Sequence, residues 1–175
     1  MVAAVVRAAD GTIRAAPKHS GFIPLEMTAS GYDSHSKIIP GRACGYSMQG
    51  GQLQNAMYLD MRVPYSAGGP YSTLDDLLQW NKALHAGGFL GKPTYERMIA
   101  PNPETSGENV IFGYGIFITQ RLGHTCLSHT GAVNGFLSAL QYYPVLRASL
   151  IVLSNFVDLA RFMPMIERLS ELFLQ

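Results

Sequence analysis

At 175 residues, the chain is long enough for one domain with a sizeable hydrophobic core. Apolar residues make up 47% of it and charged residues 14%, a composition that is typical of a globular fold and excludes intrinsic disorder. The formal net charge is +1, with no run of basic residues and no acidic tail. We therefore expect neither nucleic-acid binding nor a disordered acidic segment that binds a partner.

The sequence carries no clear targeting or cofactor signal. No apolar stretch is long enough to span a membrane, and residues 1–7 lack the basic leader of a signal peptide, so the sequence assigns no compartment. Cys44 and Cys126 match no zinc or redox spacing, and we expect both to be buried free thiols. The glycines form no phosphate-binding pattern, so we expect no nucleotide, metal or other cofactor.

The first section of the chain, residues 1–63, is predicted to be rich in loops. Residues 3–9 are expected to form a helical turn or two before Asp10-Gly11 stops it. Residues 22–27, Phe-Ile-Pro-Leu-Glu-Met, are a compact apolar group that we expect to plug a core from a loop. The stretch from Gly50-Gly51 up to Val63 is expected to be irregular surface chain.

The second section, residues 64–103, has the strongest helix signal. Ser72, with Asp75 three residues later, fits a capping box, and Asp76 adds negative charge that suits a helix N-terminus. A second, shorter helix is predicted over residues 93–99, with proline at an early position. The first helix should end at Gly87-Gly88, and its apolar stripe is Leu74, Leu77, Leu78 and Leu84, with Trp80 beside it.

The third section, residues 112–175, predicts a sheet followed by a helix. Short connections predict antiparallel pairing of the strands, which are expected over residues 112–119, 124–130, 136–143 and 149–154. Residues 150–153 are apolar on both faces, which predicts a central strand with helices on both sides. An apolar face over residues 159–173 predicts a C-terminal helix, which Pro164 should split.

Together these elements predict one α/β domain of the α+β type over residues 1–175. It should contain an antiparallel sheet with a C-terminal helix packed on it and a small helical-loop region.

The tripeptide His129-Thr130-Gly131 is the strongest candidate for chemistry. It follows an apolar-polar alternation that begins at His124, so we expect a strand that ends in a glycine. A glycine there lets another molecule approach the backbone closely. A basic side chain followed by a free backbone N–H suits stabilisation of an oxyanion in acyl transfer. The alternative is a plain strand end, because such a tripeptide also arises by chance.

An ordered set of short segments carries a family resemblance. The segments are residues 22–28 (similar to F-x-P-L-G-M), 42–46 (R-A-x-G-Y), 67–77 (A-G-G-L-x-S-T-x-x-D-L), 112–115 (Y-G-x-G-W), 129–131 (Lys-Thr-Gly or His-x-Gly), 135–136 (G-F) and 153–155 (L-x-N). In these patterns the chain resembles the serine β-lactamase-like superfamily, which includes class C β-lactamases, penicillin-binding-protein-like D,D-peptidases, D-aminopeptidases and related esterases. The resemblance covers nearly all of the chain from Phe22 onward, and it implies a partial β-lactamase-like fold.

The chain departs from that family at the nucleophile. The family's Ser-x-x-Lys and Tyr-x-Asn motifs lie upstream of every matched segment, and the chain contains no Tyr-x-Asn. Its one Ser-x-x-Lys, at Ser34 and Lys37, lies between matched segments. The motif needs serine at a helix start with lysine one turn later, whereas Pro40 disfavours helix at Ile39. We therefore do not expect Ser34 to be the nucleophile, and the chain resembles the C-terminal half of such an enzyme.

The resemblance implies roles for the residues around the tripeptide. His129 would face the cleft and either hold a substrate carboxylate or assist proton transfer. Thr130 and Gly131 would contact substrate, the backbone N–H of Ala132 would be one oxyanion donor, and Asn134 would be a contact at the rim.

The function implied is that of a β-lactamase-related serine hydrolase that acts on a small amide, ester or β-lactam-like molecule and is inactive alone. Two alternatives stay open: a non-catalytic module that binds a ligand or partner in the same cleft, and a truncated fragment of a longer hydrolase. Because N-terminal strands complete the sheet in this family, we expect a homo-oligomer or a missing N-terminal half to cover the sheet edge. Histidine in place of lysine is compatible with several family activities, so the substrate is not assigned. Members are often periplasmic or secreted.

Overall fold

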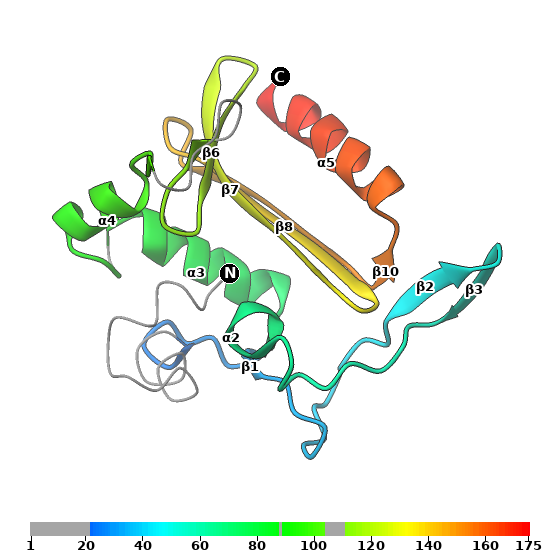
Figure 1. Ribbon diagram of the computed structural model, residues 1–175. Coiled ribbons are helices and arrows are strands. Elements are labelled where there is room, and N and C mark those ends of the chain that lie inside the picture. The colour runs from blue at the N-terminus through cyan, green and yellow to red at the C-terminus, as the bar shows by residue number, and fades with distance from the viewer. Residues whose placement is uncertain (1–21, 88, 104–110) are drawn as a thin grey trace.

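The computed structural model of the chain describes residues 22–87, 89–103 and 111–175. The helical turn expected over residues 3–9 lies outside these ranges. The described part contains one antiparallel sheet of five strands, two smaller sheets and the helices that pack on them (Figure 1). The predicted mixed α/β architecture is confirmed.

The five-stranded sheet is a meander in which each strand pairs antiparallel with the next one along the chain. The reversal between β7 and β8 passes through Asn134 and Gly135, and Gly135 has a φ of +83°, a left-handed value that glycine adopts without strain. The antiparallel pairing predicted from the short connections is therefore confirmed. The strands are β5 (Ile111–Phe112), β6 (Phe117–Arg121), β7 (His124–Val133), β8 (Phe136–Tyr143) and β9 (Ala148–Ser154).

Two of these strands have limits that differ from the predicted ones. The strand predicted over residues 112–119 is interrupted between β5 and β6, because Gly115 takes a φ of +80° and the N–H of Tyr114 donates to the carbonyl of Met98 at 2.9 Å. The strand predicted to end near Gly131 continues to Val133, because its pairing with β8 runs as far as the Val133–Phe136 pair. The tripeptide thus lies within β7 and not at its end.

One face of the sheet is covered by the C-terminal helix α5 (Leu159–Leu174) (Figure 1). Successive side chains of a strand point to opposite faces. On β8, Leu137 and Ala139 point to the α5 face and form a buried cluster with Phe162 and Ile166 of that helix. The predicted packing of a C-terminal helix on the sheet is confirmed.

The opposite face is covered by α3 (Leu74–His85). Tyr142 of β8 belongs to a second buried cluster, which includes Trp80 and Leu84 of this helix. Because Leu137 and Tyr142 lie on alternate sides of one strand, the sheet is a layer between two helices.

The prediction that residues 150–153 form a central strand is wrong for the described residues, since β9 lies at the end of the strand order. Its apolar residues on both faces have a different cause. Val152 packs on the α5 cluster, while on the other face Ser149 accepts a hydrogen bond of 2.9 Å from the amide of Asn81 in α3. The apolar run at residues 150–153 therefore indicates that both faces of β9 are covered, and it does not indicate that β9 has a strand neighbour on each side.

Helix α3 begins one residue later than predicted. Thr73 is the N-cap, and its hydroxyl accepts from the N–H of Asp76 at 3.3 Å, whereas the hydroxyl of Ser72 lies 2.6 Å from that of Ser30. The apolar stripe is confirmed for Leu77, Trp80 and Leu84, which are buried, but not for Leu74, which is exposed. The helix ends at His85, and Gly87 follows with a φ of +81°.

The other two predicted helices are present with different limits. Helix α4 (Lys92–Met98) begins and ends one residue before the predicted range of 93–99. The prediction that Pro164 splits the C-terminal helix is wrong, because α5 is continuous through it. Phe162 and Ile166 are buried on either side of Pro164, so packing holds both parts of the helix on the sheet despite the missing backbone hydrogen bond.

The prediction of irregular chain from Gly50-Gly51 up to Val63 is wrong for residues 50–55 and right for residues 56–63, which form neither helix nor strand. Residues 46–55 form a hairpin whose turn, Gly50-Gly51, has φ values of +56° and +77°. The hairpin extends away from the main sheet in Figure 1.

The remaining elements are α2 (Tyr65–Gly68), a sheet of β1 (Gly31–Tyr32) with β4 (Pro70–Tyr71), and a sheet in the order β10 (Phe156–Val157), β2 (Tyr46–Gln49), β3 (Gln52–Asn55).

The loop before β1 enters the core as predicted. Phe22 and Met27 are 5% and 3% exposed and belong to the cluster on the α3 side, whereas Ile23 between them is exposed.

Of the two cysteines expected to be buried, Cys126 is buried and Cys44 is exposed.

Candidate functional site

The outer edge of β7 is open beyond Ser128. Pairing with β6 ends at the Ser128–Phe117 pair, whereas pairing with β8 continues to Val133. From His129 to Val133, β7 therefore has a strand partner on one side only among the described residues. Thr130, Gly131 and Ala132 are exposed along this stretch. Alternate backbone groups of an antiparallel strand point to opposite neighbours, so part of the backbone here is available to a ligand.

The side chains of this stretch divide between the two faces of the sheet. His129 is paired with Leu140 and Thr130 with Ala139, and Ala139 points to the α5 face. His129 and Gly131 therefore lie on the α3 face, and Thr130 and Ala132 on the α5 face.

His129 is half-buried among aromatic rings. Its ring centroid lies 5.5 Å from that of Phe117 and 6.4 Å from that of Phe112. Its Nδ1 atom is shielded from solvent and forms no hydrogen bond with the described residues. Burial lowers the pKa of His129 below the ordinary histidine value, and the backbone of Thr130 acts in the opposite direction as a smaller effect.

Gly131 has a packing reason to be glycine. A Cβ at this position would lie 2.6 Å from the hydroxyl oxygen of Ser138, its register partner on β8. Such a distance is too short for a carbon–oxygen contact, so a larger residue would displace Ser138. The glycine of the tripeptide thus keeps the α3 face of β7 flat beside His129.

Ala132 and Asn134 line a recess of about 430 Å³ between the β7–β8 turn and the β2–β3 hairpin. The amide of Asn134 donates to the carbonyl of Met57 at 3.2 Å and so joins the two walls. His129 and Gly131 are not among the residues that line it. The structure therefore places the predicted site residues in two neighbouring locations, one on each face of β7. The other lining residues are Ser47, Gln49, Ala56, Val133, Gly135 and Val157.

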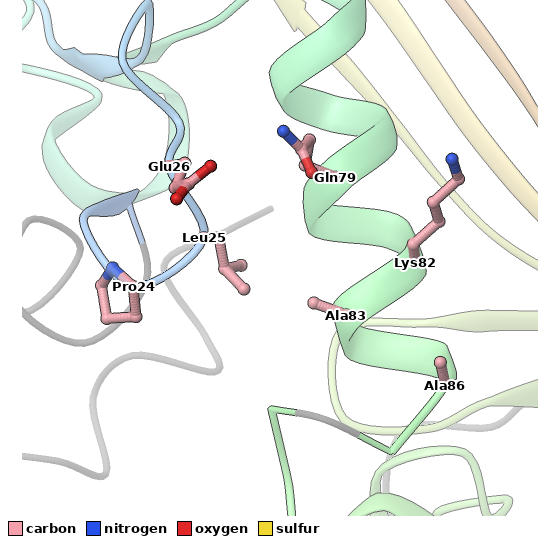
Figure 2. A pocket seen from close by; sticks show the side chains of 7 residues that line it. All are labelled: Pro24, Leu25, Glu26, Gln79, Lys82, Ala83 and Ala86. Atoms are coloured by element: carbon pink, nitrogen blue, oxygen red, sulfur yellow. The ribbon is translucent and has the colours of Figure 1, made fainter.

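A second recess, of about 420 Å³, lies away from the tripeptide, between residues 24–26 and one side of α3. Figure 2 shows Leu25 pointing toward the helix, whereas the side chain of Lys82 points away from residues 24–26. The predicted site did not include these residues, and no residue of β7 lines this recess.

Matched sequence segments meet in space in two pairs. The carboxylate of Asp76 in α3, 6% exposed, accepts from the N–H of Ala29 at 2.9 Å and from the hydroxyl of Ser30 at 2.7 Å. The amide of Asn155 donates to the carbonyl of Cys44 at 2.9 Å. The first two bonds tie the chain just after residue 28 to α3, and the third ties residue 44 to residue 155, so Asp76 and Asn155 have structural roles.

Ser34 and Lys37 lie in an exposed turn. The hydroxyl of Ser34 is 2.9 Å from that of Ser36, and the N–H of Lys37 donates to the carbonyl of Ser34 at 3.2 Å. Neither residue belongs to a helix, so the lysine side chain is not presented one helical turn after the serine.

His85, the last residue of α3, is half-buried in an aromatic cluster. Its ring stacks on Tyr142 with centroids 4.1 Å apart, and its Nδ1 lies 2.8 Å from the hydroxyl of Tyr95. Burial lowers the pKa of His85 to about 4. A helix-face analysis could have indicated this, because His85 lies four residues after the buried Asn81 and eight after the buried Leu77.

The described residues offer neither a helix that could span a membrane nor a cluster of metal-binding side chains. No helix among them combines the length and hydropathy that a membrane crossing requires. No group of three or more His, Cys, Asp and Glu side chains is arranged to hold a metal ion within these ranges.

Comparison with known proteins agrees with the resemblance seen in the sequence motifs. The chain is 22% identical over 142 residues to a D-aminopeptidase of Gluconobacter oxydans (strain 621H). The aligned region is 80% of this chain and 26% of the D-aminopeptidase. The chain superposes with a TM-score of 0.73 on a penicillin binding protein from Bacillus halodurans, at 23% identity over 90% of this chain and 49% of that one. A D-amino acid amidase from Ochrobactrum anthropi SV3, complexed with D-phenylalanine, superposes with a TM-score of 0.72 at 19% identity. The match covers 87% of this chain and 48% of the amidase.

The chain thus spans about a quarter of the D-aminopeptidase and about half of each of the two solved structures. At these identities the structural likeness shows a shared, partial β-lactamase-like fold. The sequence model of the β-lactamase family, by contrast, matches residues 1–173, nearly the whole chain. The protein therefore belongs to the β-lactamase family.

Proposed function

We propose that this chain forms the oxyanion and substrate-binding side of a hydrolase site for a small amide, ester or β-lactam-like molecule. The observation that carries the proposal is the edge of β7 from His129 to Val133, which is open beyond Ser128 and exposed at Thr130, Gly131 and Ala132. Backbone N–H groups on such an edge stabilise negative charge on a ligand oxygen without reorganisation.

The roles follow from the position of each residue. The N–H of Ala132 is the proposed oxyanion donor, and Thr130 and Gly131, which lie along the same open edge of β7, are the proposed ligand contacts. His129, with one ring nitrogen shielded, is the proposed proton-transfer or positioning group. Asn134 lies at the rim, where its amide already holds Met57.

Hydrolysis by this chain alone is proposed to be incomplete. A serine hydrolase needs a nucleophile with a base within hydrogen-bond reach. The chain's single Ser-x-x-Lys, at Ser34 and Lys37, has neither the helical setting nor the hydrogen bond that would activate the serine. The nucleophile would have to come from polypeptide other than these 175 residues.

The relatives support the choice of amide and ester ligands. The D-aminopeptidase and the D-amino acid amidase are both named for the cleavage of a bond next to a D-amino acid, and one solved relative holds D-phenylalanine. We therefore propose N-acylated or amidated amino acids as the first ligands to test on this chain.

Backbone chemical-shift mapping of the full chain with N-acetyl-D-phenylalaninamide tests the site. The proposal predicts concentration-dependent shifts at residues 129–132. Shifts confined to the recess between Leu25 and Lys82, or absent from β7, would contradict it.

Ala132→Pro and Ala132→Ser provide a matched pair for the donor. Proline removes the backbone N–H and is tolerated on a strand edge that faces no neighbour, whereas serine keeps the N–H. The proposal predicts a folded Ala132→Pro variant that loses binding and an Ala132→Ser variant that keeps it. A proline variant that does not fold would show that this N–H pairs with β8, and would therefore also count against the donor role.

A second candidate function, partner binding through the sheet edge, is favoured by β9. It is the last strand of the five-stranded order among the described residues, and Leu153 on it is 42% exposed. An unpaired strand edge with exposed apolar residues favours strand addition from another chain. We propose that a second copy, or an N-terminal half of such a hydrolase, pairs with β9.

A further inference from the structure

The surroundings of His129 determine which form of its ring the site can hold. Phe117, on β6, and Phe112, on β5, place their ring centroids 5.5 and 6.4 Å from the imidazole. On the β8 side its register partner is Leu140, which is 6% exposed. The side chains that pack against the ring are therefore apolar, and the backbone of Thr130, which raises the pKa of His129, is a smaller effect than burial.

No charge near the ring compensates for its protonation. Within residues 22–87, 89–103 and 111–175, no carboxylate lies within 4.0 Å of a His129 nitrogen, whereas His35 does have such a neighbour in Asp60. A protonated imidazole carries an N–H on both nitrogens. One of these donors would be at Nδ1, which is shielded and has no acceptor. Leaving a buried donor unpaired is costly, so the geometry disfavours the cation.

We infer that Phe112 and Phe117 hold His129 in its uncharged form, so that the part of a ligand seated against this ring is an amide or ester group and not a carboxylate. This inference rests on the proposed function and narrows its ligand class. Burial also lowers the pKa of His129, in agreement with the geometry.

The chemistry of the neutral ring fits such a ligand. Because Nδ1 is shielded, only the other ring nitrogen can reach a ligand. In the neutral ring that nitrogen is either a donor, which suits the C=O of an amide or ester, or an acceptor, which suits the N–H of an amide. Selection of a carboxylate relies instead on charge-assisted hydrogen bonds from a cation such as lysine or arginine. Of the two roles that the family resemblance implies for His129, the structure thus favours proton transfer over the holding of a carboxylate.

NMR titration of the full chain, with carbon-13-labelled histidine, tests the charge of His129. The inference predicts that His129 titrates below the ordinary histidine value of about 6.5. Phe117→Ala should move its pKa upward by admitting water to the ring. The matched control is Ile111→Ala, which removes an exposed apolar side chain from neighbouring β5. Titration of His129 at or above the ordinary value, or an unchanged pKa in Phe117→Ala, would overturn the inference.

A pair of probes that differ in one group tests the ligand class. N-acetyl-D-phenylalaninamide and N-acetyl-D-phenylalanine differ only by an amide against a carboxylate, and binding is read from the backbone shifts of residues 129–132 at pH 7. The inference predicts that the amide binds the unchanged chain at least as tightly as the carboxylate does. In His129→Lys, the preference for the carboxylate over the amide should rise by about tenfold, near 1.4 kcal/mol. A carboxylate that binds the unchanged chain about tenfold more tightly would overturn the inference.

Failure of the proposed function gives a different result. If neither probe shifts residues 129–132, the site itself is wrong. The titration then decides the charge of His129 independently, because it needs no ligand.

Discussion

Gly45 and Gly135 pack backbone against backbone, which fixes the turn between β7 and β8 against the chain that enters β2. A Cβ added at Gly135 would lie 2.6 Å from the Cα of Gly45, and a Cβ added at Gly45 would lie 2.9 Å from the Cα of Gly135. Both distances are shorter than carbon atoms approach without bonding. Two glycines far apart in the sequence are therefore needed at this contact, next to Asn134 and Ala132.

Gly135→Ala is expected to destabilise the fold more than Gly51→Ala. Gly135 has a φ of +83° and Gly51 a φ of +77°, so both variants carry the cost of a left-handed residue, about 1 kcal/mol. Only Gly135 also has neighbours, since nothing lies within 4 Å of a Cβ at Gly51. Overpacking should add roughly 1–3 kcal/mol to the free energy lost in Gly135→Ala. Urea denaturation of both variants measures the difference, and equal losses would contradict the close contact.

Asp76→Ala is expected to cost about 2–3 kcal/mol of unfolding free energy, because it leaves the N–H of Ala29 and the hydroxyl of Ser30 without their acceptor. Asp75→Ala is the matched control, one residue earlier on α3 and exposed, and should change stability by no more than about 0.5 kcal/mol. Chemical denaturation of the two variants makes the comparison. Similar losses would mean that Asp76 acts only as a charge in the first turn of the helix.

The helices and the long strands could be predicted from the sequence because their signals are local. The apolar spacing of α3 reflects a stripe with Leu77 and Leu84 buried on one side. The limits were less predictable where two residues compete for one role. Ser72 and Thr73 both suit an N-cap, and Thr73 has it because Ser72 lies beside the hydroxyl of Ser30, a partner far away in the sequence.

The β2–β3 hairpin and the division of the site could not be predicted in the same way. The strands of the hairpin are four residues each and alternate only briefly, at Tyr46, Met48 and Leu53, and β3 is exposed along its whole length, so the Gly50-Gly51 turn was the clearest signal of the hairpin. The pattern placed Ala132 and His129 in one candidate site. Their separation onto two faces follows from the alternation of side chains along β7. The aromatic contacts of His129 depend on the pairing of β7 with β6, and no local pattern encodes that pairing.

His85 is expected to make stability depend on pH in mildly acidic solution. Burial lowers the pKa of His85 to about 4 in the folded protein, whereas an unfolded histidine titrates near 6.5. As the pH falls, the unfolded state takes up the proton first. The contribution of His85 is thus complete above about pH 6.5 and is lost progressively as the pH falls toward 4, by roughly 2–3 kcal/mol.

Urea unfolding at pH 7 and pH 4.5 checks this dependence. His85→Gln should lose stability at pH 7 but show a smaller fall between the two pH values than the unchanged chain. His35→Gln, at a position where the side chain is 52% exposed, is the control and should keep the fall. An equal fall in His85→Gln and the unchanged chain would assign the pH dependence to other groups.

Association is expected to depend on concentration and on the β9 edge. Light scattering across a dilution series should show species larger than the 19.1 kDa monomer at high concentration. Leu153→Lys places a charge on the exposed edge and should shift the equilibrium toward the monomer. A compact monomer at every concentration, with cooperative thermal unfolding, would contradict pairing through β9.

Hydrolysis by the full chain tests most directly whether it supplies only the oxyanion side of the site. The measurement is the steady-state turnover of p-nitrophenyl esters and a chromogenic β-lactam by the unchanged chain and by Ser34→Ala. Because oxyanion donors without a nucleophile leave only a small residual acceleration, we expect rates little above the buffer background in both proteins. Clear turnover by the unchanged chain that disappears in Ser34→Ala would contradict the account and identify Ser34 as the nucleophile.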